Sequence, residues 1–367
     1  MGKTNWRNFD FWLLGSVALL TVFGITMIRS SIAGNIELMQ ANLVQRQLIF
    51  AVLGFVVVFV VASIDYHLWS AISRPIYLIT AIVLAVLTIA GQALYGSARW
   101  FDTGVILIQP SELAKIVVIL VLADYFTRHH EQINDLRWIA RSLVYTLGIV
   151  TWIILQPNLS TSLVILVIWF ALLWASGLRI RYLLAFVGLA PLIPLIAFPF
   201  LQEYQQKRIL NFIFPEQGAS YGESYNIQQA LISIGSGGWF GQGYGQGTQV
   251  QLRFLKVRWS DFIFSVISNE LGLVGAILTM LLIIFVILRC LRAARIARDT
   301  FGALIAYGVA TLIAFQAMVN IGVNLNLLPA TGLTLPFVSY GGSSLLSLLV
   351  GVGLVESVVL RFKSLEF

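Results

Sequence analysis

The chain has 367 residues, of which 59% are hydrophobic and only 11% are charged, and it carries a formal net charge of +7 at pH 7. Soluble globular domains hold about 25% charged residues, so this composition excludes that class and is typical of an integral membrane protein. The single cysteine, Cys290, excludes a disulfide framework and a metal site built from cysteines.

Ten apolar runs, bounded by charged residues, proline or glycine, follow one another along the chain. A helix needs about 20 apolar residues to cross a hydrocarbon core of roughly 30 Å, so we interpret the runs as ten transmembrane helices. The predicted fold class is an all-α integral membrane protein, one polytopic domain over residues 1–367. The runs cover residues 11–28, 47–64, 76–95, 108–126, 142–156, 159–177, 182–201, 262–288, 303–325 and 344–360.

Lysine and arginine are distributed unevenly between the two sets of connecting loops. With the N-terminus inside, 14 of them fall on the cytoplasmic side, whereas the short opposite loops hold only Arg29, Arg46 and Arg99. The positive-inside rule therefore predicts that both termini are cytoplasmic. The same rule explains the basic run 289–298 as an anchor of the preceding helix, more simply than as a nucleic-acid or lipid site. No nucleic-acid partner is expected.

The start of the fourth run, Gln109–Lys115, places charges at membrane depth. Glu112 and Lys115 lie three residues apart and so meet on one side of a helix. Ionisable groups inside a membrane are rare and usually functional, and two interpretations stand: a structural ion pair, or a site that holds a charged substrate. Just before them, Arg99 and Asp102 lie in an outer loop, as contacts for an anionic head group or as plain surface residues.

One connection is much longer than the others. Residues 202–260, between the seventh and eighth runs, form a polar, glycine-rich loop on the non-cytoplasmic side, and loops of this length are functional or disordered. The segment Ile234–Gly247 holds too many aromatic residues for a flexible linker. We therefore expect it to be ordered, with glycines that allow tight turns and close backbone approach to a ligand.

Asp261 opens the eighth run directly after this loop. On a helix, Ser265, Ser268 and Gly272 project within about 40° of it, and this narrow polar stripe should face protein or a water-filled cavity rather than lipid. Aspartate is favoured as a helix N-cap, and a carboxylate at the mouth of a dry cleft also suits a general base for a hydroxyl group. Both roles fit the pattern.

The last loop, Leu327–Ser344, combines prolines, glycines and hydroxyl side chains at membrane depth. This composition indicates irregular backbone, which a bilayer tolerates only where it lines a cavity. The hydroxyls are candidates to bind sugar or phosphate, and a purely structural re-entrant turn fits equally well. The sequence has no phosphate loop and no HExxH zinc motif, so we predict no cofactor and no metal ligands, and leave a divalent cation open.

Five segments form one recognisable set: Gln109–Lys115, Ile234–Gly243, Asp261–Phe264, Asn269–Gly272 and Leu328–Ser344. In this set the chain resembles the SEDS family (shape, elongation, division and sporulation), the membrane glycosyltransferases that polymerise peptidoglycan. The resemblance covers essentially the whole chain, including ten spans and a large loop between spans seven and eight. A further segment, 247–255, resembles the elongation member RodA more than the division member FtsW.

The resemblance implies a reaction and the residues that perform it. The GlcNAc 4-hydroxyl of one lipid-linked disaccharide attacks the MurNAc anomeric carbon of a growing lipid-linked glycan, and undecaprenyl diphosphate leaves. The family's catalytic aspartate falls on Asp261, which would take the acceptor's proton in an inverting transfer, while cations such as Arg253 would offset charge on the diphosphate. The implied substrate-binding residues are Arg99, Glu112, Lys115, Lys207, Arg208, Gln229, Ser339 and Ser343.

The resemblance also implies a location and partners. The expected location is the bacterial inner membrane, and the expected partners are lipid II, the nascent glycan strand, membrane lipids and a class B penicillin-binding protein, which is a transpeptidase. Two alternatives from other classes are a lipid II flippase and a non-catalytic scaffold for the penicillin-binding protein.

Several positions depart from the family's usual pattern. The segment Lys256–Asp261 lacks the Pro, Glu and His that usually precede the aspartate. Ala98 stands where the first of two arginines is usual, and Asn158 stands where an aspartate is usual. These changes keep the proposed base and put secondary contacts around it in doubt.

Overall fold

The computed structural model describes residues 6–34, 36–95, 100–102, 107–132, 135–189, 198–214 and 223–362. Within these ranges the chain is helical apart from its connecting loops and one short antiparallel hairpin, in which β1 (Phe101–Asp102) pairs with β2 (Leu107–Ile108). The all-α fold class is therefore confirmed. Arg99 lies outside the described residues, and of Asp102 only the backbone is described.

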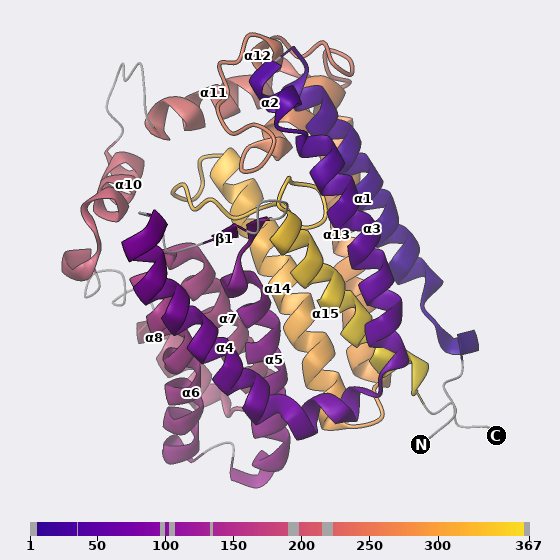
Figure 1. The fold of residues 1–367 in the computed structure, drawn as a ribbon, viewed down its shortest axis with the longest axis vertical. Helices are drawn as coiled ribbons and strands as arrows, with labels where there is room; N and C mark the ends of the chain where they lie inside the picture. Colours follow the sequence, from indigo (N-terminus) through magenta and orange to yellow (C-terminus); the bar gives the residue numbers. More distant parts are fainter. Residues whose placement is uncertain are drawn as a thin grey trace.

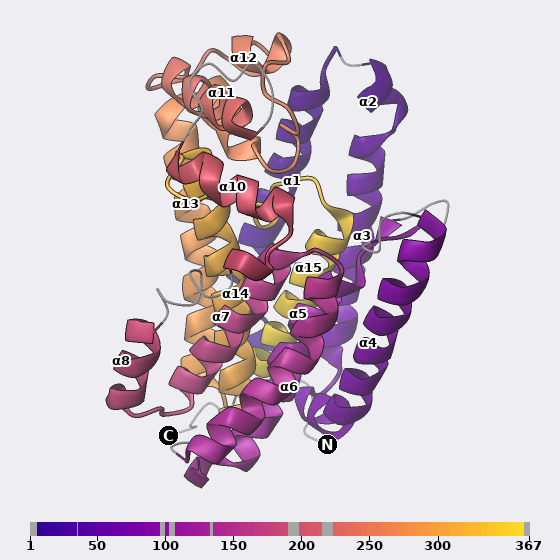
Figure 2. The same cartoon turned by 90° about the vertical axis from the view of Figure 1, so that its left-hand side faces the viewer.

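The long helices form one bundle, with α14 and α15 at its centre, α1, α3 and α13 on one side and α4 to α7 on the other (Figure 1). The first and last described residues lie at the same end, here called the terminal end, and α11 and α12 lie at the opposite end, here called the loop end (Figure 2). The helices are α1 (Phe11–Ile32), α2 (Ile36–Gln40), α3 (Leu43–Ser63), α4 (Tyr66–Tyr95), α5 (Pro110–Arg128), α6 (Leu136–Leu155), α7 (Leu159–Ala175), α8 (Ile180–Leu189), α10 (Glu203–Ile213), α11 (Glu223–Ser236), α12 (Thr248–Gln251), α13 (Ile263–Ile296), α14 (Thr300–Asn324) and α15 (Gly342–Leu360), with single 3-10 turns at Trp6–Asn8, His130–Gln132 and Phe198–Phe200.

Every predicted apolar run overlaps one of these helices, and among the described residues seven helical stretches are long and apolar enough to cross a membrane. The other three predicted spans fall on α5, α7 and α8. The charges of α5 lower its mean hydropathy, α7 has 17 residues, and α8 is described over 10 residues. The seven stretches are Phe11–Ile32, Glu37–Ser63, Tyr66–Ile89, Leu136–Leu155, Ile263–Ile296, Thr300–Asn324 and Gly342–Leu360.

The outer surface of the bundle is apolar. Large aliphatic side chains on several helices are more than half exposed, among them Leu19 on α1, Val52 on α3, Ile82 on α4 and Leu281 on α13. A protein in water does not expose apolar patches of this extent, whereas a bilayer is their natural solvent. The chain is a multi-pass membrane protein.

The charged side chains of α5 have partners inside the bundle. At its terminal end, the Asp124 carboxylate accepts hydrogen bonds from the hydroxyls of Ser70 and Ser73 on α4, the latter at 3.2 Å. The Arg128 guanidinium donates to the same carboxylate at 2.9 Å. Because a buried charge is tolerated only when it is paired and hydrogen-bonded, these contacts allow α5 to lie in the core.

The basic run 289–298, most of which lies in the last turns of α13, does more than anchor that helix. Asp10 is the N-cap of α1, and its carboxylate accepts from the backbone N–H of Leu13 at 3.0 Å and from Arg289 at 2.5 and 2.8 Å. The backbone N–H of Asp10 donates to the buried carboxylate of Glu356 on α15 at 3.0 Å. Arg289 therefore ties α13 to α1 at the terminal end.

Helix α13 is broken at Gly272, whose φ of +67° and ψ of −166° are far from helical values. A break within a membrane helix leaves carbonyls before it and N–H groups after it without their helical partners. Before the break, the carbonyls of Asn269 and Glu270 accept from the N–H groups of Gln242 and Gly243, each at 3.0 Å. The expectation of one continuous eighth helix is thereby corrected.

After the break, the same glycine-rich segment supplies the acceptors. The carbonyls of Gly238 and Trp239 accept from the N–H groups of Leu273 and Val274 at 2.8 and 3.1 Å. The two halves of α13 are thus joined by hydrogen bonds to a segment that lies about thirty residues earlier in the chain.

The glycines of this segment permit close contact with α13. A Cβ atom on Gly241 would lie 2.1 Å from the carbonyl oxygen of Glu270, and one on Gly237 would lie 1.8 Å from that of Ser268. The segment is ordered, as expected. At these positions, however, the backbone that approaches is that of α13, which corrects the expectation of a ligand.

We predict that Gly272→Ala destabilises the protein by about 3 kcal/mol or more, because the added Cβ requires a backbone conformation essentially restricted to glycine and overlaps its neighbours. That Cβ would lie 2.4 Å from the backbone nitrogen of Gly241. Thermal unfolding in detergent measures the loss. Gly235→Ala is the matched control, since a Cβ there meets nothing within 4 Å, and equal melting temperatures for the two variants would contradict the prediction.

Candidate active site

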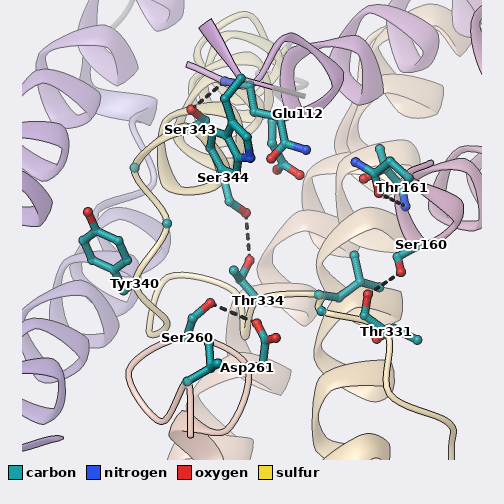
Figure 3. Close-up of a pocket in the computed structure, with 18 of the residues that line it drawn as sticks. Glu112, Ser160, Thr161, Ser260, Asp261, Thr331, Thr334, Tyr340, Ser343 and Ser344 are labelled. Carbon is teal, nitrogen blue, oxygen red and sulfur yellow. Dashed lines mark hydrogen bonds between the residues drawn. The ribbon is translucent and has the colours of Figure 1, made fainter. Parts of the chain in front are cut away.

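A cavity of about 490 Å³ opens among the helix ends and loops toward the loop end (Figure 3). Its walls come from segments far apart in the sequence, which the fold brings together. The lining residues are Arg46, Phe50, Trp100, Gln109, Glu112, Asn158, Ser160, Thr161, Arg208, Val257, Trp259, Ser260, Asp261, Thr331, Gly332, Leu333, Thr334, Tyr340, Gly341, Gly342, Ser343 and Ser344.

Asp261 lies in a turn at the wall of this cavity. The N-cap of α13 is Phe262, so the alternative that Asp261 caps the helix is wrong. Its carboxylate accepts a hydrogen bond from the Ser260 hydroxyl at 3.0 Å. Its backbone carbonyl accepts from the side-chain amides of Asn320 and Asn324 at 3.0 and 2.9 Å, so the neighbouring helix α14 fixes the turn.

Asn324 also takes over the capping of α13. Its side-chain carbonyl accepts from the backbone N–H of Ser265 at 3.1 Å and from the Ser265 hydroxyl at 2.6 Å. Ser265, Ser268 and Gly272 are all buried. The prediction that this stripe faces protein rather than lipid is confirmed.

The last loop forms one wall of the cavity with irregular backbone, as predicted. The Ser160 hydroxyl at the start of α7 donates to the carbonyl of Thr331, and the hydroxyls of Thr334 and Ser344 lie 2.9 Å apart (Figure 3). Gly332, with φ +74°, follows Thr331, and a Cβ on it would lie 3.7 Å from the Asp261 carboxylate. The loop is therefore held from both sides beside that carboxylate.

Three long helices, α5, α7 and α15, begin at the cavity wall, and α13 begins directly after Asp261. The N-terminus of a helix carries a partial positive charge and N–H groups without helical acceptors. Helix starts gathered around one cavity therefore favour an anionic group inside it.

Two arginines add full positive charge to the lining. Arg208 extends from α10, and Arg46 lies in the first turn of α3, where it hydrogen-bonds Tyr340. Burial raises the pKa of the Tyr340 phenol, and Arg46 partly offsets this rise. The sequence analysis uses Arg46 only to assign topology. The feature that could have identified it as a site residue is its position on the expected outer side, next to an apolar run.

Glu112 and Lys115 form the predicted ion pair, with 2.7 Å between the Lys115 ammonium and a Glu112 carboxylate oxygen. Lys115 is fully buried and does not line the cavity, whereas Glu112 does. The structure therefore shows the ion pair directly, and of its two residues only Glu112 reaches the cavity.

The other predicted residues fall at different distances from the cavity. Ser343 lines it and its hydroxyl accepts from the backbone N–H of Gln109 at 3.0 Å. Ser339 lies behind the wall, where its hydroxyl accepts from the N–H of Leu335 at 2.8 Å and donates to the carbonyl of Ser260 at 2.7 Å.

Three further predicted residues, Lys207, Gln229 and Arg253, do not line the cavity. Lys207 is exposed on α10, and Gln229 is half-buried on α11. The Arg253 guanidinium donates to the carbonyl of Gly34 beyond the end of α1. Their roles in substrate binding therefore stay predictions.

Two of the sequence departures have a structural explanation. The side-chain carbonyl of Asn158 accepts from the N–H of Thr161 at 3.3 Å, so asparagine caps α7 as an aspartate would. Arg258 is buried and donates to the carbonyl of Ser31 in the last turn of α1. Burial lowers the pKa of this guanidinium, and the contact ties the turn before Asp261 to α1.

Comparison with known proteins gives consistent matches over nearly the whole chain. The family profile described as cell cycle protein, covering FtsW, RodA and SpoVE, matches residues 11–363. The chain is 35% identical over 367 residues to the peptidoglycan glycosyltransferase MrdB of Escherichia coli K12, with 99% of this chain and 97% of that one covered. It is 34% identical over 371 residues to the probable peptidoglycan glycosyltransferase FtsW of Hydrogenovibrio crunogenus, with coverage of 97% and 94%.

Two solved structures share the fold. One, described as structural coordination of polymerization and crosslinking by a peptidoglycan synthase complex, contains a chain that matches with a TM-score of 0.80 and 30% identity, covering 96% of this chain and 97% of that one. The rod shape determining protein RodA of Thermus thermophilus matches with a TM-score of 0.70 and 30% identity, covering 97% and 98%.

Proposed function

Because the chain belongs to the FtsW, RodA and SpoVE family and is a peptidoglycan glycosyltransferase, we propose that it extends lipid-linked glycan strands with lipid II. The GlcNAc 4-hydroxyl of lipid II forms a new bond to the MurNAc anomeric carbon of the growing strand. The bond from that carbon to the diphosphate breaks, and undecaprenyl diphosphate leaves with its electron pair. The configuration at the anomeric carbon is inverted.

In this proposal Asp261 is the general base that takes the proton of the 4-hydroxyl. The observation that carries it is a carboxylate beside an open cavity, on a turn that Asn320 and Asn324 hold by its backbone. A base must be held within hydrogen-bond reach of the proton that it removes. Bonds to the backbone fix the turn that carries the carboxylate, and the carboxylate itself lies at the cavity.

The positive groups of the cavity would stabilise the departing diphosphate. Arg46 and Arg208 supply full charges, and the helix starts at α5, α7 and α15 supply partial ones. Positive groups fixed in advance at the place where negative charge develops are usually a large contribution to catalysis. We propose no cofactor for this step and leave a divalent cation open.

We propose ten membrane crossings in one domain over residues 1–367, with both termini in the cytoplasm and residues 202–260 outside. The grouping of both described termini with the basic run 289–298 at one end of the bundle supports this orientation. The cavity then opens on the outer side of the bacterial plasma membrane, where glycan strands are built.

Two finer assignments rest on resemblance. We assign the chain to elongation and cell shape on the segment 247–255. Overall identity does not separate the two roles, because the whole chain is 35% identical to a MrdB and 34% identical to an FtsW. We propose a class B penicillin-binding protein as partner. The match to a chain of a peptidoglycan synthase complex that coordinates polymerization and crosslinking supports this partner.

Reconstitution of the purified protein into liposomes with fluorescent lipid II tests the proposed reaction, with the products separated on a gel. Long glycan chains are the expected result, and a parallel assay with EDTA decides whether a divalent cation is needed. Movement of labelled lipid II across the bilayer without chains would indicate a flippase. Chains that appear only when an active polymerase is added as partner would indicate a scaffold.

We predict that Arg208→Gln lowers the rate of polymerisation by about 10-fold, since it removes one of the charges that face the diphosphate. Arg29→Gln is the control, because Arg29 is an exposed arginine in the last turn of α1 that does not line the cavity. Its rate should stay within about 2-fold of the wild type. Equal losses in the two variants would show that the effect comes from the general positive charge of the protein and not from Arg208.

A further inference from the structure

The turn 238–241 presents two aromatic side chains to the surroundings of the protein. Phe240 is 82% exposed and Trp239 is 70% exposed. Neither residue lines the cavity of Asp261, and the proposed reaction does not use them. Aromatic side chains of this size expose an apolar surface that favours contact with another apolar phase.

The turn is held rigidly. Gly238 and Gly241 adopt φ values of +54° and +79°, and the N–H of Gly241 closes the turn on the carbonyl of Gly237 at 2.8 Å. The carbonyls of Gly238 and Trp239 are bonded to the first two residues of the second half of α13. The two aromatic side chains are therefore fixed relative to the start of that half-helix.

The surface of α13 next to the turn is exposed and apolar, as expected of a helix face in contact with lipid. A stripe of apolar side chains begins at the two residues that bond the turn and continues toward the terminal end. The residues of this stripe and their exposed fractions are Leu273 (44%), Val274 (39%), Ile277 (44%), Leu278 (60%), Leu281 (55%), Ile284 (45%) and Leu288 (56%).

The length of the stripe places the turn at a membrane boundary. From residue 273 to residue 288 the helix is about 24 Å long, close to the roughly 30 Å of a hydrocarbon core. The stripe ends at Arg289 and Arg292, which suit one interface. The turn with Trp239 and Phe240 lies at its other end, and therefore at the opposite interface.

We propose that the turn 238–241 is a lipid anchor, in which Trp239 and Phe240 insert into the boundary between headgroups and acyl chains of the leaflet at the loop end. Tryptophan is enriched at this depth because its ring is apolar and its N–H is polar. Phenylalanine adds apolar area to be buried at the same boundary. Continuity with the lipid-facing stripe favours lipid over a protein partner as the occupant.

The anchor would also set the height of the cavity. The segment that carries the turn bonds the carbonyls of Asn269 and Glu270, which end the half-helix that starts two residues after Asp261. Through these hydrogen bonds, the depth at which the turn inserts into the bilayer is linked to the position of Asp261. This consequence rests on the proposed function, because it matters only if substrates arrive within that leaflet.

Spin-label depth measurements on the full-length protein alone, in phosphatidylethanolamine and phosphatidylglycerol liposomes, test the anchor. A nitroxide is attached to Phe240→Cys in a Cys290→Ala background, and its collision rates with oxygen and with a water-soluble nickel chelate are compared. Labels at Ile277 and Leu281 calibrate depth in the bilayer, and a label at Gln228, exposed on α11, gives the value in water.

The expected ratio of oxygen to nickel collisions at position 240 lies between those at positions 277 and 228, and clearly above the latter. A ratio equal to that at position 228 would overturn the proposal in favour of a solvated loop. Protection from both reagents would overturn it in favour of a protein contact. The measurement needs no turnover, so its outcome is independent of whether the chain polymerises lipid II.

Discussion

Asp261→Asn is expected to lower glycan polymerisation by about 10³-fold or more in the liposome assay, because an amide cannot accept the proton of the acceptor hydroxyl. General bases contribute roughly 10² to 10⁴ in rate. The substitution preserves size, and the bonds from Asn320 and Asn324 go to the backbone carbonyl of this residue. The loss should therefore be chemical and not structural.

The initial rate of chain formation measures this effect, and a thermal unfolding curve in detergent is its control. The melting temperature of the variant should match that of the wild type. A variant that folds normally and keeps at least a tenth of the rate would place the proton acceptor elsewhere. Asp261→Glu, which retains a carboxylate at a different reach, should recover part of the lost rate.

Lys115→Met is expected to destabilise the protein by about 3–5 kcal/mol, which is the usual consequence of leaving one member of a buried ion pair alone. The Lys115 ammonium is fully buried, 2.7 Å from the carboxylate of Glu112. Met fills much of the same space with no charge, so the remaining cost is that of the unpaired carboxylate. Equilibrium unfolding in detergent measures the change.

The double variant Lys115→Met/Glu112→Gln separates the two interpretations of this pair. If the pair is structural, removing both charges should restore most of the stability lost in Lys115→Met. Activity then distinguishes the role of Glu112, which also lines the cavity. A stable double variant with normal KM and rate would limit the pair to structure, whereas equal instability of the single and double variants would refute the charge argument.

The helices were predictable because hydropathy over about 20 residues is a local property of the chain. Each predicted run overlaps a helix, including α13. The break at Gly272 was not predictable in the same way, since the groups that compensate it lie in the segment 237–243. The glycines of that segment predicted close approach, but their spacing does not say which backbone they approach.

Contacts between residues far apart in the sequence also explain why parts of the predicted site were wrong. Aspartate before an apolar run is a reasonable N-cap, yet Asn324 on another helix performs the capping beside Asp261. Arg46 was missed because positive charge near a helix end already has a topological explanation. The last loop was predicted correctly because irregular backbone at membrane depth has few alternatives.

The contacts of α5 have a consequence for biogenesis. A segment with Glu112, Lys115 and Asp124 partitions poorly into lipid by itself. Its own lysine neutralises Glu112, however, and the hydroxyls that bind Asp124 belong to α4, which is synthesised just before it. The two helices can therefore enter the bilayer together as a hairpin that already contains its polar partners, ahead of the central helices α14 and α15 that later enclose it.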